Sequence, residues 1–108
     1  MKLRYLPTAE PGLRWFRHYY RNNPQLDLAK AINALARAEA TLVEFPYSGA
    51  VFEDFEAVRE HKIVGTAFSL LYSVARETVW IIDLRDPRGQ RTAETLRRFL
   101  DELRRQTS

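Results

Sequence analysis

The order of the apolar segments constrains this chain more than any single motif does. A short alternating segment (2–6) comes first, and two stretches with helical spacing follow between residues 8 and 43. Three further apolar runs then read as strands: 58–64, 68–74 and 79–86. With only 108 residues, one sheet must pack against both helices if the apolar faces of all these elements are to be buried.

We therefore expect a single α+β domain spanning residues 1–108. Its core, residues 2 to about 91, is expected to be a twisted, mostly antiparallel sheet with the N-terminal helical hairpin packed on it. Apolar residues at helical spacing predict an extra C-terminal helix over about 92–106. The acidic, aromatic segment 50–57 is expected to be a loop.

The first predicted helix carries more aromatic rings than one buried stripe needs. Phe16 and Tyr20 share one stripe, and Trp15 and Tyr19 form an adjacent one. We expect part of this surface to be a groove that a partner's helix fills. The alternative is that all four rings pack in the chain's own core. Thr8 is expected to cap this helix at its N-terminus.

The second predicted helix, about 25–43, is rich in alanine. Its main apolar stripe is expected to consist of four larger side chains, widened by alanines: Leu28, Ile32, Leu35 and Leu42. Six alanines between positions 29 and 40 raise helix propensity and allow another backbone to approach closely.

Composition excludes several classes of chemistry. There are no cysteines, two widely separated histidines and no glycine-rich phosphate loop, so we expect no metal and no cofactor. No leader-like segment or apolar stretch of membrane-spanning length is present, so we expect a cytoplasmic protein without membrane contact.

The net charge of +3 is unevenly placed, with five acidic residues and one basic residue in 44–60. All but three bases are arginines, which suits acidic protein segments or nucleic acid as partners.

Three local motifs accompany this order of elements: the F-P-x-x-G turn at 45–49, Val58-Arg59-Glu60 opening one strand, and Leu70-Leu71-Tyr72 within the next. Together they resemble the RelE/ParE family of toxins from bacterial toxin–antitoxin pairs, over residues 2 to about 91. The resemblance implies a toxin that a cognate antitoxin neutralises by wrapping it with an acidic amphipathic C-terminal segment. ParE-type members poison DNA gyrase, whereas RelE-type members cleave messenger RNA on the ribosome.

The residues favour the ParE-like interpretation, with growth inhibited by binding to gyrase rather than by catalysis. The resemblance and the aromatic groove together give the expected antitoxin-binding residues: Arg14, Trp15, Phe16, Arg17, Tyr19, Tyr20 and Arg59. Three arginines after the last strand form a basic corner expected to bind the target: Arg85, Arg88 and Arg91. Homo-oligomers and hetero-oligomers with the antitoxin are both compatible with the resemblance.

Each of these assignments has a structural alternative. Arg59 is expected to face the same way as His61 and Ile63, and an internal ion pair with Glu60, Glu77 or Asp83 would explain it equally well. Taken singly, each arginine of the basic corner is more typical of a solvated turn residue. Asp83 and Asp86 are expected to pair with Arg85 or Arg88.

The alternative activity is a RelE-like endoribonuclease with Arg59, Arg85 and Arg88 around the phosphate. The arginine that is usual before the Leu-x-Tyr of such nucleases is replaced by Ser69, and no tyrosine or histidine follows the last strand within residues 84–91. His61 in a strand is more typical of a structural role than of a general base. A small nucleic-acid-binding or structural module without toxicity is the third class.

Overall fold

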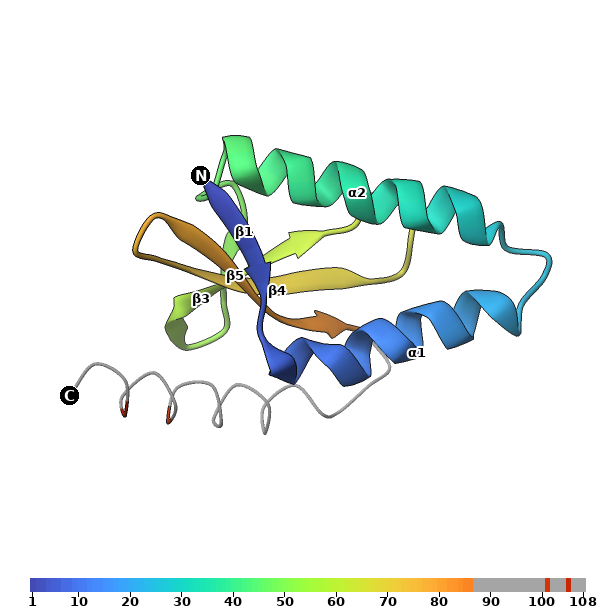
Figure 1. Ribbon diagram of the computed structural model, residues 1–108, viewed down its shortest axis with the longest axis horizontal. Helices are drawn as coiled ribbons and strands as arrows, with labels where there is room; N and C mark the ends of the chain where they lie inside the picture. Colours follow the sequence, from blue (N-terminus) through green and yellow to red (C-terminus); the bar gives the residue numbers. More distant parts are fainter. Residues whose placement is uncertain (87–100, 102–104, 106–108) are drawn as a thin grey trace.

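A computed structural model describes residues 1–86, 101 and 105 of the chain. The elements follow one another in the order β1 (Lys2–Tyr5), a 3₁₀ turn (Pro7–Ala9), α1 (Glu10–Arg21), α2 (Leu28–Glu44), β2 (Ala50–Phe52), β3 (Phe55–Lys62), β4 (Ser69–Ala75) and β5 (Thr78–Arg85). The two helices run antiparallel and are joined at one end of the molecule (Figure 1).

The five strands form one sheet in the order β1-β5-β4-β3-β2. β1 lies at one edge and pairs in parallel with β5, while every other neighbouring pair is antiparallel. The α+β class with a mostly antiparallel sheet is therefore confirmed. The predicted C-terminal helix lies almost wholly outside the described residues.

The helical hairpin begins differently from the sequence-based expectation. Thr8 does not cap α1, because it lies in the 3₁₀ turn and its hydroxyl donates to the Ile82 carbonyl at 2.7 Å. The second helix starts at Leu28, where the Asp27 side chain accepts a hydrogen bond from the Lys30 amide at 3.2 Å. An acidic N-cap of this kind satisfies one of the free amides of the first helical turn.

Three of the four larger side chains expected in the apolar stripe of α2 face the core: Leu42 is buried, and Leu28 and Leu35 pack against the core while partly buried. The buried residues of α2 are Ala31, Ala34, Ala38 and Leu42. Ile32, which was expected in the main stripe, is 47% exposed. Small side chains on the inner face allow the helix axis to approach its neighbours closely, and this contact geometry decides which stripe is buried.

Segment 50–57, expected to be a loop, forms strand β2 and the start of β3. Phe52 and Phe55 are paired across a two-residue turn, in which Glu53 has a positive φ of 47°. The prediction failed because such turns usually contain glycine or asparagine, and none is present here. β3 also ends two residues earlier than expected, at Lys62.

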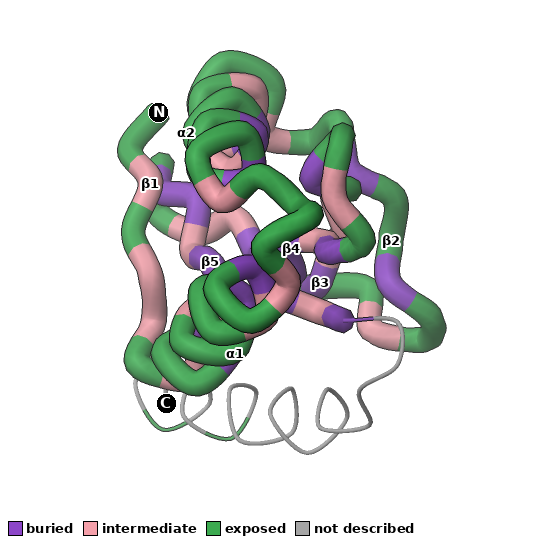
Figure 2. Tube along the Cα trace, turned by 90° about the vertical axis from the view of Figure 1, so that its right-hand side faces the viewer, coloured by how far each residue is buried: buried purple, intermediate pink, exposed green. Residues whose placement is uncertain are grey.

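Each face of the sheet buries its own apolar cluster. The larger cluster lies between the sheet and the two helices and includes Leu70 and Tyr72 of β4 and Phe68 just before it, as the alternation of segment 68–74 predicts. The smaller cluster, on the other face, contains Phe52, Val58, Leu71 and Ile82. Figure 2 shows the exposed outer sides of both helices and the buried positions between them and the strands. Among the described helices, none has the length and apolar character needed to cross a membrane.

Candidate functional site

The four aromatic rings of α1 divide into a buried pair and an outer pair. Phe16 and Tyr20 are 1% and 7% exposed, and the Phe16 ring meets Phe68 edge-on with 5.0 Å between centroids. They are core residues, so the expectation that they contact an antitoxin is corrected. Trp15 is 42% exposed, whereas Tyr19 is half-buried and its ring packs edge-on against Phe68 with 5.7 Å between centroids. Of these two rings, Trp15 is therefore the more accessible from outside.

Trp15 is held in place although its ring is exposed. Its indole nitrogen donates a 2.9 Å hydrogen bond to the carboxylate of Asp86, a buried residue just after β5. Its ring also lies 5.8 Å from that of His18 and 6.4 Å from that of Tyr19, centroid to centroid. An apolar surface that is fixed before binding loses little conformational entropy when a partner covers it.

Basic side chains surround this aromatic surface. The exposed residues of α1 include Arg14, Arg17 and Arg21, with Glu10 as the acidic one. Arg14 forms an ion pair with Glu10 one helical turn earlier, and both side chains are largely exposed. Exposed pairs of this kind contribute little to stability, so both arginines that flank Trp15 can meet acidic groups of a partner. We call Arg14, Trp15, Arg17 and Tyr19 the α1 surface.

Arg59 faces the same way as His61 and Ile63, as expected, but the internal ion pair offered as its structural alternative is not formed. Its guanidinium donates to the Gly49 carbonyl at 2.7 Å and to the Tyr47 carbonyl at 3.4 Å, and it stacks over the Tyr47 ring. It therefore fixes the loop between α2 and β2. Arg59 donates to backbone carbonyl groups, whereas we had expected it to pair with a carboxylate.

The same loop explains two of the sequence motifs. Tyr72, the tyrosine of Leu70-Leu71-Tyr72, accepts a 2.9 Å hydrogen bond from the amide of Gly49, the glycine of F-P-x-x-G. A Cβ atom at Gly49 would lie 2.7 Å from both the Tyr72 hydroxyl and the Glu60 carbonyl oxygen. Gly49, Arg59 and Tyr72 are thus joined by hydrogen bonds, which give these motif residues a structural role in holding the α2–β2 loop against the sheet.

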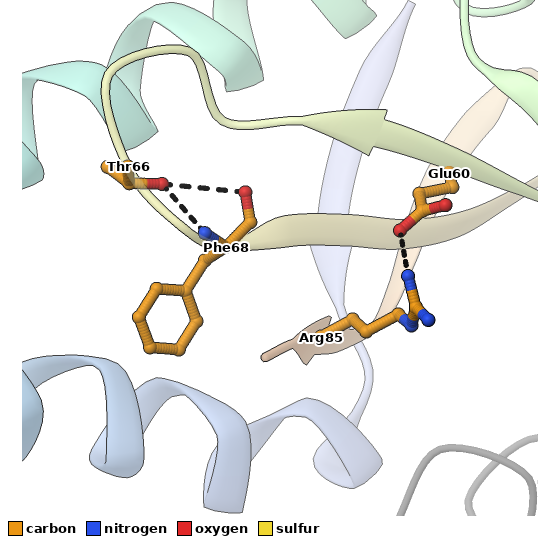
Figure 3. A network of polar contacts seen from close by, with 4 residues as sticks. All are labelled: Glu60, Thr66, Phe68 and Arg85. Carbon is orange, nitrogen blue, oxygen red and sulfur yellow. Dashed lines mark hydrogen bonds and ion pairs between the residues drawn. The ribbon is translucent and has the colours of Figure 1, made fainter. Parts of the chain in front are cut away.

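Arg85 is the member of the basic corner that lies within the described residues, and it too interacts with other residues of the chain. Arg85 on β5 and Glu60 on β3 form an ion pair of 3.0 Å across β4 (Figure 3). The Arg85 guanidinium also lies over the Phe52 ring, 5.4 Å from its centroid. Its carboxylate partner is therefore Glu60, where we had expected Asp83 or Asp86. Arg88 and Arg91 lie outside the described residues.

The residues considered for RNA cleavage lie on different sides of the sheet. Arg59 and His61 are opposite Tyr72 and Leu70 on the helix-covered face, whereas Glu60 and Arg85 belong to the other face. Burial lowers the pKa of His61, which weakens it as a proton acceptor. Asp83 is 2% exposed, and its carboxylate accepts from the amide of Leu84. Residues 1–86 therefore do not bring Arg59, Arg85 and a general base together.

Two features of the surface were missed by sequence reasoning. One is the anchoring of Trp15 by Asp86, which joins residues 71 positions apart and leaves no local signal. The other is a small cleft between α2 and β3 lined by Arg37, His61 and Lys62. Within the described part of the chain, no group of three or more histidine or acidic side chains is arranged to hold a metal ion.

Comparison with known proteins adds no assignment to these observations. No protein-family model matches the chain, and no curated protein has significant sequence similarity to it.

Proposed function

We propose that this protein is a ParE-like toxin of a type II toxin–antitoxin pair, which inhibits growth by binding a protein target, DNA gyrase, in the cytoplasm. A cognate antitoxin would hold it inactive. The proposal rests on the resemblance of its element order and motifs to the RelE/ParE family, and it is supported by the exposed ring of Trp15.

The α1 surface suits an amphipathic acidic helix. Trp15 supplies a fixed apolar anchor, Tyr19 extends it, and Arg14 and Arg17 flank it with positive charge. Aromatic anchors dominate the affinity of such interfaces, and complementary charges orient the partner.

Catalysis is not part of this proposal. Arg59 is bound to loop carbonyls and Arg85 to Glu60, so either would have to give up an internal contact to bind a scissile phosphate. These internal contacts favour the ParE-like activity over the RelE-like one. They do not bear on Arg88 and Arg91.

The activity is tested by inducing the protein without a partner in a bacterial host. Growth arrest with an SOS response and gyrase-trapped DNA breaks is the expected result. Rapid cleavage of transcripts would instead support the RelE-like nuclease, and unimpaired growth would support a module without toxicity.

The binding surface is tested with the polypeptide encoded next to this gene, measured by calorimetry. Trp15→Ala combined with Tyr19→Ala is expected to weaken binding by about 2 kcal/mol or more, as for aromatic hot spots. Phe45→Ala is the matched control, because Phe45 is an exposed aromatic residue at the end of α2. Equal affinity of the folded double variant and the wild type would refute the α1 surface as the binding site.

A further inference from the structure

The segment that leads into the first helix follows the last strand through a series of close contacts. Each contact joins a residue further along segment 6–15 to a residue further along segment 81–86: Leu6 with Ile81, Thr8 with Ile82, Gly12 with Asp83, and Trp15 with Asp86. The contact at the far end of this series therefore fixes the most exposed ring of the α1 surface.

The indole ring of Trp15 has one polar group, and Asp86 binds it. Tryptophan can donate a hydrogen bond only through Nε1–H and has no acceptor. This group donates to the Asp86 carboxylate at 2.9 Å, and Asp86 is 8% exposed. Since the N–H group is turned toward a buried residue, the ring atoms that remain available to a partner are carbon atoms.

The other contacts of the Trp15 ring come from its own helix. The ring is tilted by 31° against the ring of His18 and by 48° against that of Tyr19. Ring contacts of this kind tolerate a range of orientations, whereas a hydrogen bond to a carboxylate is directional and charge-assisted. Asp86 is therefore the residue that selects one orientation of the indole.

We propose that Asp86 is the positioning residue of the α1 surface and that a partner covers the Trp15 ring with an aliphatic side chain. The inference rests on the proposed function, because it concerns the same surface. Asp86 acts through Trp15, since it holds the ring in the orientation that the partner meets. A polar side chain placed on the exposed ring carbons would lose its water contacts and find no hydrogen-bond partner there.

The first test uses the full chain without a partner. The chain has two tryptophans, so ¹⁵N relaxation of the two indole groups can be followed separately. We expect a Trp15 order parameter near the value of a rigid backbone, about 0.85, that falls below about 0.6 in Asp86→Ala. Trp80, whose Nε1 donates to the Ala75 carbonyl at 3.3 Å, is the internal reference and should not change. An equally rigid Trp15 indole in the folded variant would overturn the proposal.

The second test is a double-mutant cycle with the polypeptide encoded next to this gene. Asp86→Ala is expected to weaken its binding roughly fivefold, because the ring must then be ordered on binding. In a Trp15→Phe background the same change should have no further effect, since phenylalanine has no N–H group for Asp86 to hold. A purely structural role of Asp86 would weaken binding equally in both backgrounds, and that result would overturn the proposal.

Two further variants separate positioning from folding. Asp86→Asn keeps an acceptor oxygen without the charge and should lose only part of the affinity that Asp86→Ala loses. Trp80→Phe removes the other indole hydrogen bond and should bind as the wild type does. Equal weakening by Trp80→Phe would contradict the assignment to the Trp15 contact.

NMR spectra of the complex test the chemistry of the partner. The ring carbon signals of Trp15 should move on binding, while its indole proton should keep its slow exchange, because it stays bound to Asp86. An indole proton that transfers to an acceptor of the partner would overturn the aliphatic assignment. Absence of binding by the wild type would count against the proposed function, whereas normal wild-type binding without coupling between the two residues would refute this inference alone.

Discussion

Tyr72 and Tyr5 both place a hydroxyl group inside the molecule, but with different consequences. The Tyr72 hydroxyl accepts from the Gly49 amide, and burial raises the pKa of the phenol. The Tyr5 hydroxyl is buried and makes no hydrogen bond of good geometry, although the Glu39 carboxylate lies close to it. Burial raises its pKa too, and the neighbouring Glu39 carboxylate raises it further. A buried polar group without a partner loses its water contacts and gains nothing in return.

We predict opposite results for the same substitution at these two positions. Tyr72→Phe should lower the free energy of unfolding by about 1–3 kcal/mol, because the buried Gly49 amide loses its acceptor. Tyr5→Phe should leave it unchanged or raise it. Equilibrium urea unfolding measures both, and equal losses at the two positions would contradict the hydrogen-bond assignment.

His61 makes the stability of the fold depend on pH. Its pKa in the folded protein lies below the value of about 6.5 that an unfolded chain gives it, because of burial. The unfolded chain therefore binds more protons in this range, and stability rises with pH. The free energy of unfolding should therefore fall as the pH is lowered below about 6.5. His61→Gln should remove this part of the decrease, and parallel curves for both proteins from pH 7 to 5 would disprove it.

Among the elements, the β4–β5 hairpin has the most demanding turn. Ala75 and Thr78 are paired, so the turn has two residues, Arg76 and Glu77, with φ of 53° and 58°. Two successive positive φ angles match the twist of a hairpin, but side chains beyond glycine and asparagine adopt them at a cost.

We predict that Glu77→Gly stabilises the protein by about 0.5–1 kcal/mol, since the strain relieved exceeds the entropy that glycine loses on folding. Glu56→Gly is the control, because Glu56 is exposed in β3 and its φ is not positive. The control should destabilise the protein. Thermal unfolding of the two variants tests this, and a lowered melting temperature for Glu77→Gly would count against it.

Elements with strong periodicity were predictable from the sequence. Segment 68–74, which contains β4, alternates as expected because its period of two leaves one register that buries Phe68, Leu70 and Tyr72 together. The bulge between β4 and β5 at Leu71 and Tyr72 was not foreseen. Strands 50–52 and 55–57 were also missed, because a turn without glycine resembles a loop in sequence.

The candidate site was less predictable than the fold. Helical spacing shows that Trp15 and Phe16 lie on different stripes of α1, but it does not show which stripe is buried. Phe16 is the buried residue because its ring packs against Phe68, which is distant in sequence. The direction of Arg59 follows from strand alternation. The acceptors of Arg59 are the Tyr47 and Gly49 carbonyls. Their positions depend on how the loop between α2 and β2 folds against the sheet, and no local sequence pattern predicts this.

On the scale of the whole molecule, α1 docks directly on the last strand. A Cβ atom at Gly12 would collide with the Asp83 carboxylate and lie 3.0 Å from the Leu84 amide nitrogen. The Asp83 carboxylate thus lies beside the first turn of α1, where the helix dipole favours negative charge. Glycine at this position allows the contact between helix and sheet.

We predict that Gly12→Ala destabilises the protein by about 1–3 kcal/mol through overpacking, although alanine is the better helix former by about 1 kcal/mol. Ala36→Gly, at an exposed position of α2, isolates the effect of helix propensity and should cost about 1 kcal/mol. Chemical denaturation of both variants is the measurement. A Gly12→Ala protein more stable than the wild type would contradict the close packing.

The parallel pairing of β1 with β5 has a consequence for synthesis of the chain. Lys2 lies opposite Thr78, so the edge strand β1 has no place to bind until β5 has left the ribosome. Until then the helical hairpin has been made without the strands that cover its alanine and aromatic faces. Until β5 has been made, the nascent chain therefore exposes apolar surfaces that the finished protein buries, and a partner or chaperone could bind those surfaces only during synthesis.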